Sequence, residues 1–409
     1  MQMRPIIAAL GRHKVATWLI ILQVALTLAV TTNALYIVAT RVVHFSRVTG
    51  TDETHIFTIR NGWKSGLAAT DVEAHVRADL QTLRNVTGVR DVFASQTYPL
   101  AGANGIILAG LKLERDQTAQ PPRGVVYLAD DHAIDTLGVT LEEGRNFHRE
   151  EIGSLGPDDK PAAAGIIITR FLADKLFPAG GALGKTVYLP GGPSVIIGIV
   201  KQLQSPLRAS ATLDQASILL PALPRDPEGL VYLVRAATPE LAPVMDATLK
   251  SLEGHGGDRI IDAQHGIVSM PQAREDAYDS DRSVAMLLSA VCGLLLLATA
   301  GGIVGLSSFW VSQRRTQVGI RRSLGATRGD ILRYFHAENF LIVSGGVGLG
   351  LVLAVLGNIG LMKVYPLQLM PLYVPVLGAV GLWVLGQLAV WGPAVYAAKV
   401  PPVEAIRSS

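Results

Sequence analysis

Four stretches of this chain contain no Asp, Glu, Lys or Arg, and each is long enough to cross a lipid bilayer. A membrane-spanning helix needs about 20 apolar residues, and in lipid only a helix satisfies every backbone polar group within such a segment. Because three prolines stand near the start of the fourth run, we place its helix at 373–396. The four runs cover residues 15–40, 283–313, 339–362 and 364–398.

Composition supports this interpretation. Hydrophobic residues make up 49% of the chain and charged residues only 17%, whereas soluble domains carry about 25% charged residues. The first run also has a feature of a signal peptide, because basic residues precede it. It is longer than the roughly 7–15 apolar residues of a signal-peptide core, however, and no A-x-A-like cleavage site follows it cleanly. We therefore expect an uncleaved anchor.

The charges are distributed unevenly between the loops. Residues 41–282 hold 24 Lys and Arg against 30 Asp and Glu, a net charge of −6, while the rest of the chain holds 12 basic and 3 acidic residues, a net charge of +9. Short loops rich in Lys and Arg stay in the cytoplasm. The pattern predicts a multi-pass protein with residues 41–282 outside. The terminal tails 1–14 and 397–409 and the loop 314–338 are predicted to be cytoplasmic.

The external segment predicts a two-part α/β domain. Helical periodicity occurs at 71–84 and again at 239–252, and strand-like residues flank each helix. Two such β-α-β units form a split βαβ, or ferredoxin-like, fold. Short β-like runs between them predict an inserted, mostly-β subdomain. The expected parts are 50–97 with 226–270 for the split βαβ subdomain, 98–225 for the insert and 271–282 for a stalk.

The polar stalk runs without a breaker into the second apolar run, which favours one long helix over a solvated linker. The fold class is thus a membrane protein with four transmembrane α-helices and a large α/β external domain between the first and second spans.

Two candidate sites for chemistry do not fit their motifs. Residues 180–186 resemble a phosphate-binding P-loop, but Ala179 stands where the first glycine belongs and a strand-like segment follows where a helix is needed. We expect a tight turn there. A second group lies across a Gly-rich turn and a strand rather than at metal-ligand spacing. Its members are His255, Asp258, Asp262 and His265.

No sequence pattern points to catalysis by this chain. The single cysteine, Cys292, lies in an apolar run, where a reactive thiolate is disfavoured. The aromatic content of 6% is low for a surface that stacks the bases of single-stranded nucleic acid. We therefore expect no enzyme activity, no metal or cofactor bound by this chain, and no nucleic-acid partner.

The loop 314–338 is the most distinctive polar segment, with six arginines against Asp330 and Glu338. Apolar residues alternate with the arginines. One interpretation is a contact with anionic lipids, at about 1 kcal/mol for each basic residue. The other is a short amphipathic element that docks into a cytoplasmic partner. We expect residues 317–332 to form a short helix or helical turn along the membrane surface.

The run R-R-T-Q-V-G-I-R-R-S-L-G-A-T-R-G-D-I at 314–331 resembles the signature loop of MacB/FtsX-type ABC transporter permeases. That family usually has R-T-x-E-I-G-I-R-R-A-L-G-A-T, so Gln317 and Ser323 depart from its pattern. Residues 393–407 are similar to the family's C-terminal P-A-x-x-A-A-x-x-x-P-x-E-A-L/I-R, and residues 143–147 resemble part of its periplasmic core domain.

The resemblance implies a permease in the bacterial inner membrane that works with an ABC ATPase and a second permease, identical or related. MacB carries its ATPase domain in the same chain, whereas this chain begins 14 residues before its first span; we therefore expect ATP and Mg²⁺ to bind a separate subunit. ATP binding would shift the spans and move the external domain, a mechanism called mechanotransmission. The residues implicated in coupling are Gln317, Val318, Gly319, Ile320, Arg321, Arg322, Leu324, Gly325, Ala326 and Ile331.

Several functions are compatible with this family. The favoured one is MacB-like efflux, for which a periplasmic adaptor and an outer-membrane channel are candidate partners. The alternatives are lipoprotein release, as in Lol-type permeases, and regulation of a cell-wall hydrolase, as in FtsX. FtsX-like external domains are much smaller than the segment 41–282, which disfavours the last. A sensor or adhesin anchored by four spans would not explain the arginine-rich loop.

Overall fold

The chain forms two compact units, the α/β domain (Ser46–Ser280) and the membrane unit (Met1–Phe45 with Asp281–Ser409). The structure is a computed structural model. It describes residues 14–64, 67–103, 105–207, 213–227, 229–254, 259–262, 266–363 and 369–399.

Four helices in the described part of the chain are long and apolar enough to cross a membrane. The expected stalk and second run form one continuous helix, α7, as predicted. Helix α9 begins at Arg328 rather than at 339, because Thr327 caps a helix that also takes in the charged residues 328–338. The four helices are α2 (Lys14–Phe45), α7 (Met270–Gln313), α9 (Arg328–Met362) and α10 (Tyr373–Lys399).

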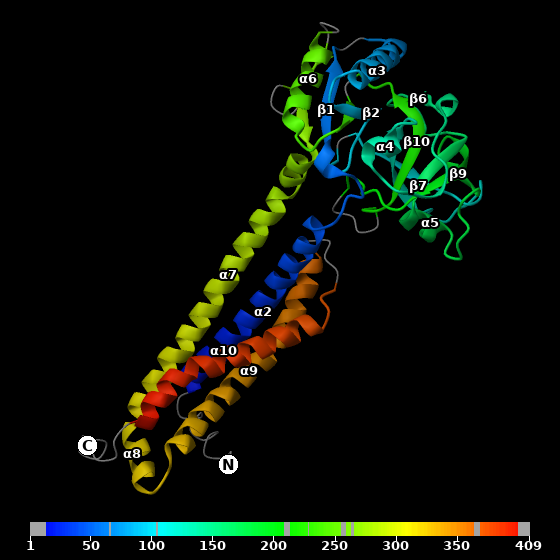
Figure 1. Cartoon of the computed structure of the whole chain (residues 1–409). Coiled ribbons are helices and arrows are strands. Elements are labelled where there is room, and N and C mark those ends of the chain that lie inside the picture. Colours follow the sequence, from blue (N-terminus) through cyan, green and yellow to red (C-terminus); the bar gives the residue numbers. More distant parts are fainter. Residues whose placement is uncertain are drawn as a thin grey trace. The chain divides into compact units, whose positions relative to one another are not determined.

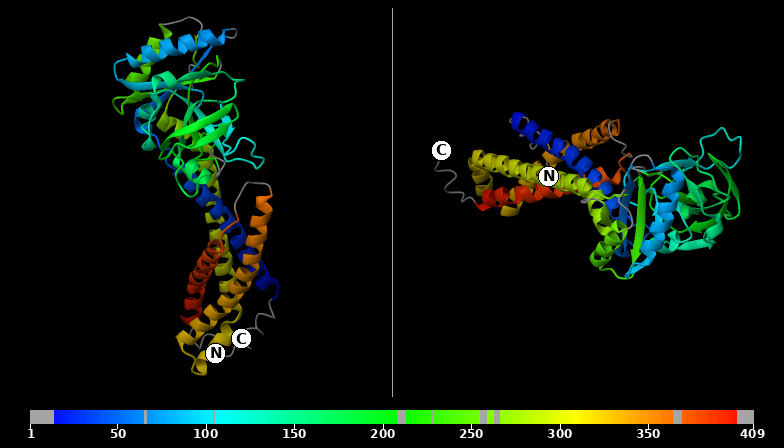
Figure 2. Two further views of the ribbon diagram at one scale, coloured as in Figure 1. Left: turned by 90° about the vertical axis from the view of Figure 1, so that its right-hand side faces the viewer. Right: turned by 90° about the horizontal axis from the view of Figure 1, so that it is seen from above.

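Glycines allow the membrane helices to approach closely. A Cβ added at Gly346 of α9 would lie 2.7 Å from the Cβ of Val24 in α2, and one at Gly350 would lie 2.9 Å from the Cβ of Leu28. Close van der Waals packing of this kind holds helices together in lipid, where the hydrophobic effect is lost. Helix α2 therefore lies along α9, and α10 packs on both, as Figures 1 and 2 show.

The first sheet of the α/β domain has the strand order of a split βαβ fold, as predicted. Its order is β12-β1-β11-β2, with β13 also paired to β1, and every pairing is antiparallel. Helix side chains such as Val72, Val76 and Leu252 are buried against it. The elements are β1 (Ile56–Trp63), α3 (Ala69–Arg84), β2 (Val89–Ser95), β11 (Leu230–Ala236), α6 (Leu241–Glu253), β12 (Arg259–Ile260) and β13 (Ile267–Ser269).

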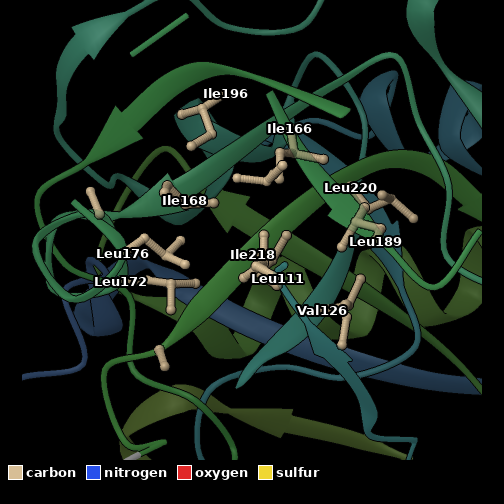
Figure 3. Packing of buried hydrophobic residues seen from close by; sticks show 14 of the residues in the cluster. Leu111, Val126, Ile166, Ile168, Leu172, Leu176, Leu189, Ile196, Ile218 and Leu220 are labelled. Atoms are coloured by element: carbon tan, nitrogen blue, oxygen red, sulfur yellow. The ribbon is translucent and has the colours of Figure 1, made fainter. Parts of the chain in front are cut away.

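The insert forms a mixed eight-stranded sheet of order β3-β4-β10-β7-β9-β5, in which β6 pairs with β10 and β8 with β9. Leu172 and Leu176 of a short helix share a core with Ile168 and Ile218 of the sheet (Figure 3). The elements are β3 (Ile107–Gly110), β4 (Arg123–Ala129), α4 (Ala133–Leu137), β5 (Leu141–Gly144), β6 (Gly153–Leu155), β7 (Gly165–Thr169), α5 (Arg170–Leu176), β8 (Thr186–Leu189), β9 (Gly192–Val200) and β10 (Ser217–Pro224).

The P-loop-like segment can be compared with the structure in full, and the candidate metal ligands only in part. Residues 180–186 form the expected turn, since the N–H of Lys185 donates to the carbonyl of Ala182 at 3.2 Å and β8 follows directly. A P-loop would continue into a helix instead. Of the four metal candidates, Asp262 is described, whereas His255, Asp258 and His265 lie outside the described residues.

Candidate functional site

The arginine-rich loop folds into a helical hairpin, and we call residues 314–338 the basic hairpin. Its first helix is α8 (Arg315–Ser323). Gly325, just beyond α8, has a left-handed φ of +98°. The N–H of Ala326 donates to the carbonyl of Arg321 and that of Gly325 to the carbonyl of Arg322, both at 3.1 Å. These two bonds form a Schellman motif, which ends the helix.

The second helix starts at once. The Oγ1 of Thr327 accepts from the N–H of Asp330 at 3.2 Å, and the Oδ2 of Asp330 accepts from the N–H of Thr327 at 3.0 Å. This reciprocal arrangement is a capping box. Residues 324–327 therefore encode a helix stop followed by a helix start. The predicted single turn at 317–332 is instead divided between α8 and α9.

One side of the basic hairpin is packed into the membrane unit. Val318 and Ile331 are only 7% and 3% exposed, and they share a core with Phe335. Val311 of α7 and Ala394 of α10 complete the same cluster. The hairpin therefore has a fixed base formed by three of the membrane helices.

A buried ion pair joins the two arms of the hairpin. Arg314 Nη1 lies 2.9 Å from both carboxylate oxygens of Glu338, and the two side chains are 13% and 2% exposed. The Arg314 guanidinium also lies 5.8 Å from the ring centre of Trp310. The guanidinium of Arg321 lies over the ring of Tyr334, with its Cζ 4.9 Å from the ring centre. Such cation–π contacts stabilise arginine where it loses water.

The opposite side of the hairpin is open. Leu324 is 82% exposed and Ile320 is 48% exposed; at spacing i and i+4 they lie on the same side of the backbone. Arg321 follows Ile320 in α8 and is also exposed, although its guanidinium contacts Tyr334 and the residue lines the cavity between the two arms. A cavity of about 20 Å³ beneath the hairpin has room for one water molecule. The arrangement therefore suits contact with another protein rather than binding of a small molecule.

The ten predicted coupling residues all lie in this hairpin, but on different sides of it. Exposed are Gln317, Ile320, Arg321, Leu324 and Gly325; half-buried are Arg322 and Ala326; buried are Val318, Gly319 and Ile331. Sequence reasoning missed the roles of Arg314, Tyr334 and Glu338. The signal for the ion pair was that Arg314 and Glu338 are the two charges that bound the loop.

Four apolar helices with an α/β domain between the first two and a basic hairpin between the next two define a multi-pass membrane protein of the permease class. The family model for the MacB-like periplasmic core domain matches residues 17–250, more than half of the chain, and that for the FtsX-like permease C-terminal region matches residues 289–402. The chain belongs to the MacB/FtsX-type family of ABC transporter permeases.

Individual relatives are distant. The chain is 26% identical over 299 residues to the uncharacterized ABC transporter permease YvrN of Bacillus subtilis, covering 69% of each chain. It is 25% identical over 275 residues to the macrolide export ATP-binding/permease protein MacB of Neisseria gonorrhoeae, covering 64% of this chain but 40% of MacB. The periplasmic region of MacB from Actinobacillus actinomycetemcomitans aligns at 15% identity and a TM-score of 0.33, covering 56% of this chain and 95% of that structure.

Proposed function

We propose that this chain is the permease subunit of an ABC transporter in the bacterial inner membrane, driven through the basic hairpin by a separate ATPase subunit. The observation that carries the proposal is the exposed pair Ile320 and Leu324 beside Arg321. Apolar anchors next to arginine are typical of protein interfaces. The other side of the hairpin is fixed in the membrane unit, so a force on the exposed side acts on the helices.

Helix α7 supports a mechanical route for that force. Near its start, Arg274 binds Glu53 of the α/β domain through two bonds of 2.6 Å, and Tyr278 is buried. Just past its end, Arg314 pairs with Glu338. A helix of 44 residues is about 66 Å long. Mechanotransmission through α7 requires that the ATP-bound and ATP-free states differ in these or neighbouring contacts.

The transported direction and the further partners belong to the same proposal. We place the α/β domain on the periplasmic side and propose export of a substrate from there, as the name of the MacB relative suggests. A second copy or a related permease would complete the membrane part. A periplasmic adaptor and an outer-membrane channel would complete the route, while ATP and Mg²⁺ would bind the ATPase subunit.

Co-purification tests the assignment of the hairpin. The tagged chain is purified from its own host, and the ATPase recovered with it is quantified. In the double variant Arg321→Ala, Leu324→Ser, both the charge and the apolar anchor are lost. Removal of one partner of a buried interfacial charge pair costs about 2 kcal/mol or more of binding free energy. We therefore expect the affinity for the ATPase to fall by roughly thirtyfold, and the amount of ATPase recovered to fall with it.

The matched control is Arg328→Ala, which removes the same charge from an exposed position of the same hairpin. It should retain the ATPase. Both variants should insert and run as single species on gel filtration. Full ATPase recovery with the double variant, together with weaker membrane association at high salt, would support the lipid-contact interpretation and overturn the coupling assignment.

A further inference from the structure

The membrane unit carries a groove of about 480 Å³ between α9 and α10. Its walls are aromatic: Phe340 stacks on Trp383 with ring centres 5.9 Å apart, and His336 meets Trp391 edge-on at 5.8 Å. Trp391 is 60% exposed. Two helices that are apolar enough to span a membrane form this groove, so in a bilayer the groove would face lipid.

The floor of the groove holds a polar group that lacks a partner. Gln387 pairs its Oε1 with Nδ1 of His336 at 2.7 Å, while its Nε2 is buried and donates to no acceptor among the described residues. An unpaired amide donor in hydrocarbon costs free energy. A rotation of the Gln387 amide would bring Nε2 to the groove, where an acceptor on a bound molecule would remove that cost.

Positive charge stands at one end of the groove. Arg333 is exposed and precedes His336 and Phe340 by three and seven residues on α9; this spacing puts all three on one side of the helix. Arg328, the first residue of α9, lies five residues before Arg333. The groove therefore passes from an apolar interior towards guanidinium groups, which favour phosphate.

We propose that this groove binds one anionic phospholipid. An acyl chain lies along Phe340 and Trp383, an ester carbonyl accepts from Nε2 of Gln387, and the phosphate meets Arg333. The order of these contacts along α9 and α10 matches the order of the groups in a phospholipid, from tail to head. Such a lipid contacts α9 and α10, two of the three helices that form the base of the basic hairpin, and its binding does not depend on the transported substrate.

Native mass spectrometry of the full chain, released from detergent in the presence of equal phosphatidylglycerol and phosphatidylcholine, tests the proposal. The wild type should retain phosphatidylglycerol about fivefold better than phosphatidylcholine, because one surface cation contributes about 1 kcal/mol to binding of an anionic lipid. Arg333→Ala should abolish this preference, and Gln387→Leu and Trp391→Ala should weaken retention of both lipids.

Two matched controls separate the groove from the general lipid surface. Lys363→Ala removes a cation from the other end of α9, and Trp18→Ala removes an exposed tryptophan from α2. Neither should change retention. Equal retention of the two lipids by the wild type, or equal effects of Trp18→Ala and Trp391→Ala, would overturn the site. A change of oligomeric state by Trp391→Ala without loss of lipid would overturn it in favour of an interface between copies.

Discussion

Arg314 and Glu338 illustrate how a single residue pair can fix a hairpin that is otherwise rich in exposed charge. Both are nearly inaccessible to solvent, and the carboxylate receives both of its 2.9 Å contacts from one guanidinium nitrogen. Taking two charges out of water costs much of what their attraction returns. The pair therefore specifies how α7 joins α9 more than it adds to stability.

Removal of one partner should reveal this cost. Glu338→Gln leaves the Arg314 charge buried without its counter-ion, and we expect a loss of about 3 kcal/mol in the free energy of unfolding. The double variant Arg314→Met, Glu338→Leu removes both charges and should recover most of that loss. Thermal denaturation of the detergent-solubilised chain measures both. Equal destabilisation by the single and double variants would show that the pair itself is strongly stabilising.

The buried carboxyl of Asp130 predicts that the stability of the α/β domain depends on pH. Burial raises the pKa of Asp130 from 3.8 to about 6, although Arg84, 3.0 Å away, and the N–H of His132 favour the carboxylate. Asp91 and Asp131 also lie in this cluster and interact with His132. Between these two pKa values the folded state holds a proton that the unfolded chain releases, so stability falls as pH rises through that window.

The variant Asp130→Asn cannot ionise and should escape this loss. Its melting temperature relative to the wild type should therefore rise as the pH increases from about 4 to about 7, and level off above the raised pKa of Asp130. Calorimetry at several pH values measures the difference. A constant difference across that range would contradict a raised pKa.

At the scale of elements, the hairpin depends on the short connection between α8 and α9. Gly325 has a φ of +98°, and an added Cβ would meet no atom within 4 Å. A substitution there is therefore penalised by backbone strain rather than by a clash. Gly325→Val should lower the free energy of unfolding by about 1–2 kcal/mol. Gly325→Asn should lower it less, because asparagine tolerates the left-handed region. Thermal unfolding of the two variants checks this order, and an equal loss would point to a steric cause.

Sequence patterns predicted some elements of this fold and not others. The split βαβ subdomain was predictable because its helices have clear 3.6-residue periodicity and adjacent strands. Strand β10 was not, because Pro221 and Pro224 argue against a central strand. The strand nevertheless continues through both prolines, since Pro221 pairs with Ala129 of β4 and Pro224 with Leu155 of β6. The pairing with β7 ends earlier, at Ile218 and Leu219.

The sequence predicted where in the chain the basic hairpin lies, but not which of its sides is buried. The arginine-rich motif identified the hairpin, yet Val318 and Ile320 look alike in sequence, and only one of them is buried. Which side faces the membrane unit depends on α10, whose Ala394 packs there and lies far away in the chain. Short-range patterns carry no information about such a contact.

At the scale of the whole molecule, chain order connects the two parts that the proposed function uses. The α/β domain precedes α7 and the basic hairpin follows it. If α7 crosses the membrane, these two parts must lie on opposite sides. The charge distribution then predicts a cytoplasmic hairpin. Export driven by a cytoplasmic ATPase needs this arrangement, so the topology tests the proposed function as a whole.

Cysteine labelling can test that topology. Cys292 is the single cysteine and is buried, so Cys292→Ala gives a background for two variants at exposed sites, Asp158→Cys in the α/β domain and Ser323→Cys in the hairpin. A membrane-impermeant thiol reagent should label Asp158→Cys in intact spheroplasts, because the reagent reaches only the outer face. It should label Ser323→Cys only after permeabilisation. Labelling of Ser323→Cys in intact spheroplasts would invert the orientation and remove the hairpin from the reach of any cytoplasmic ATPase.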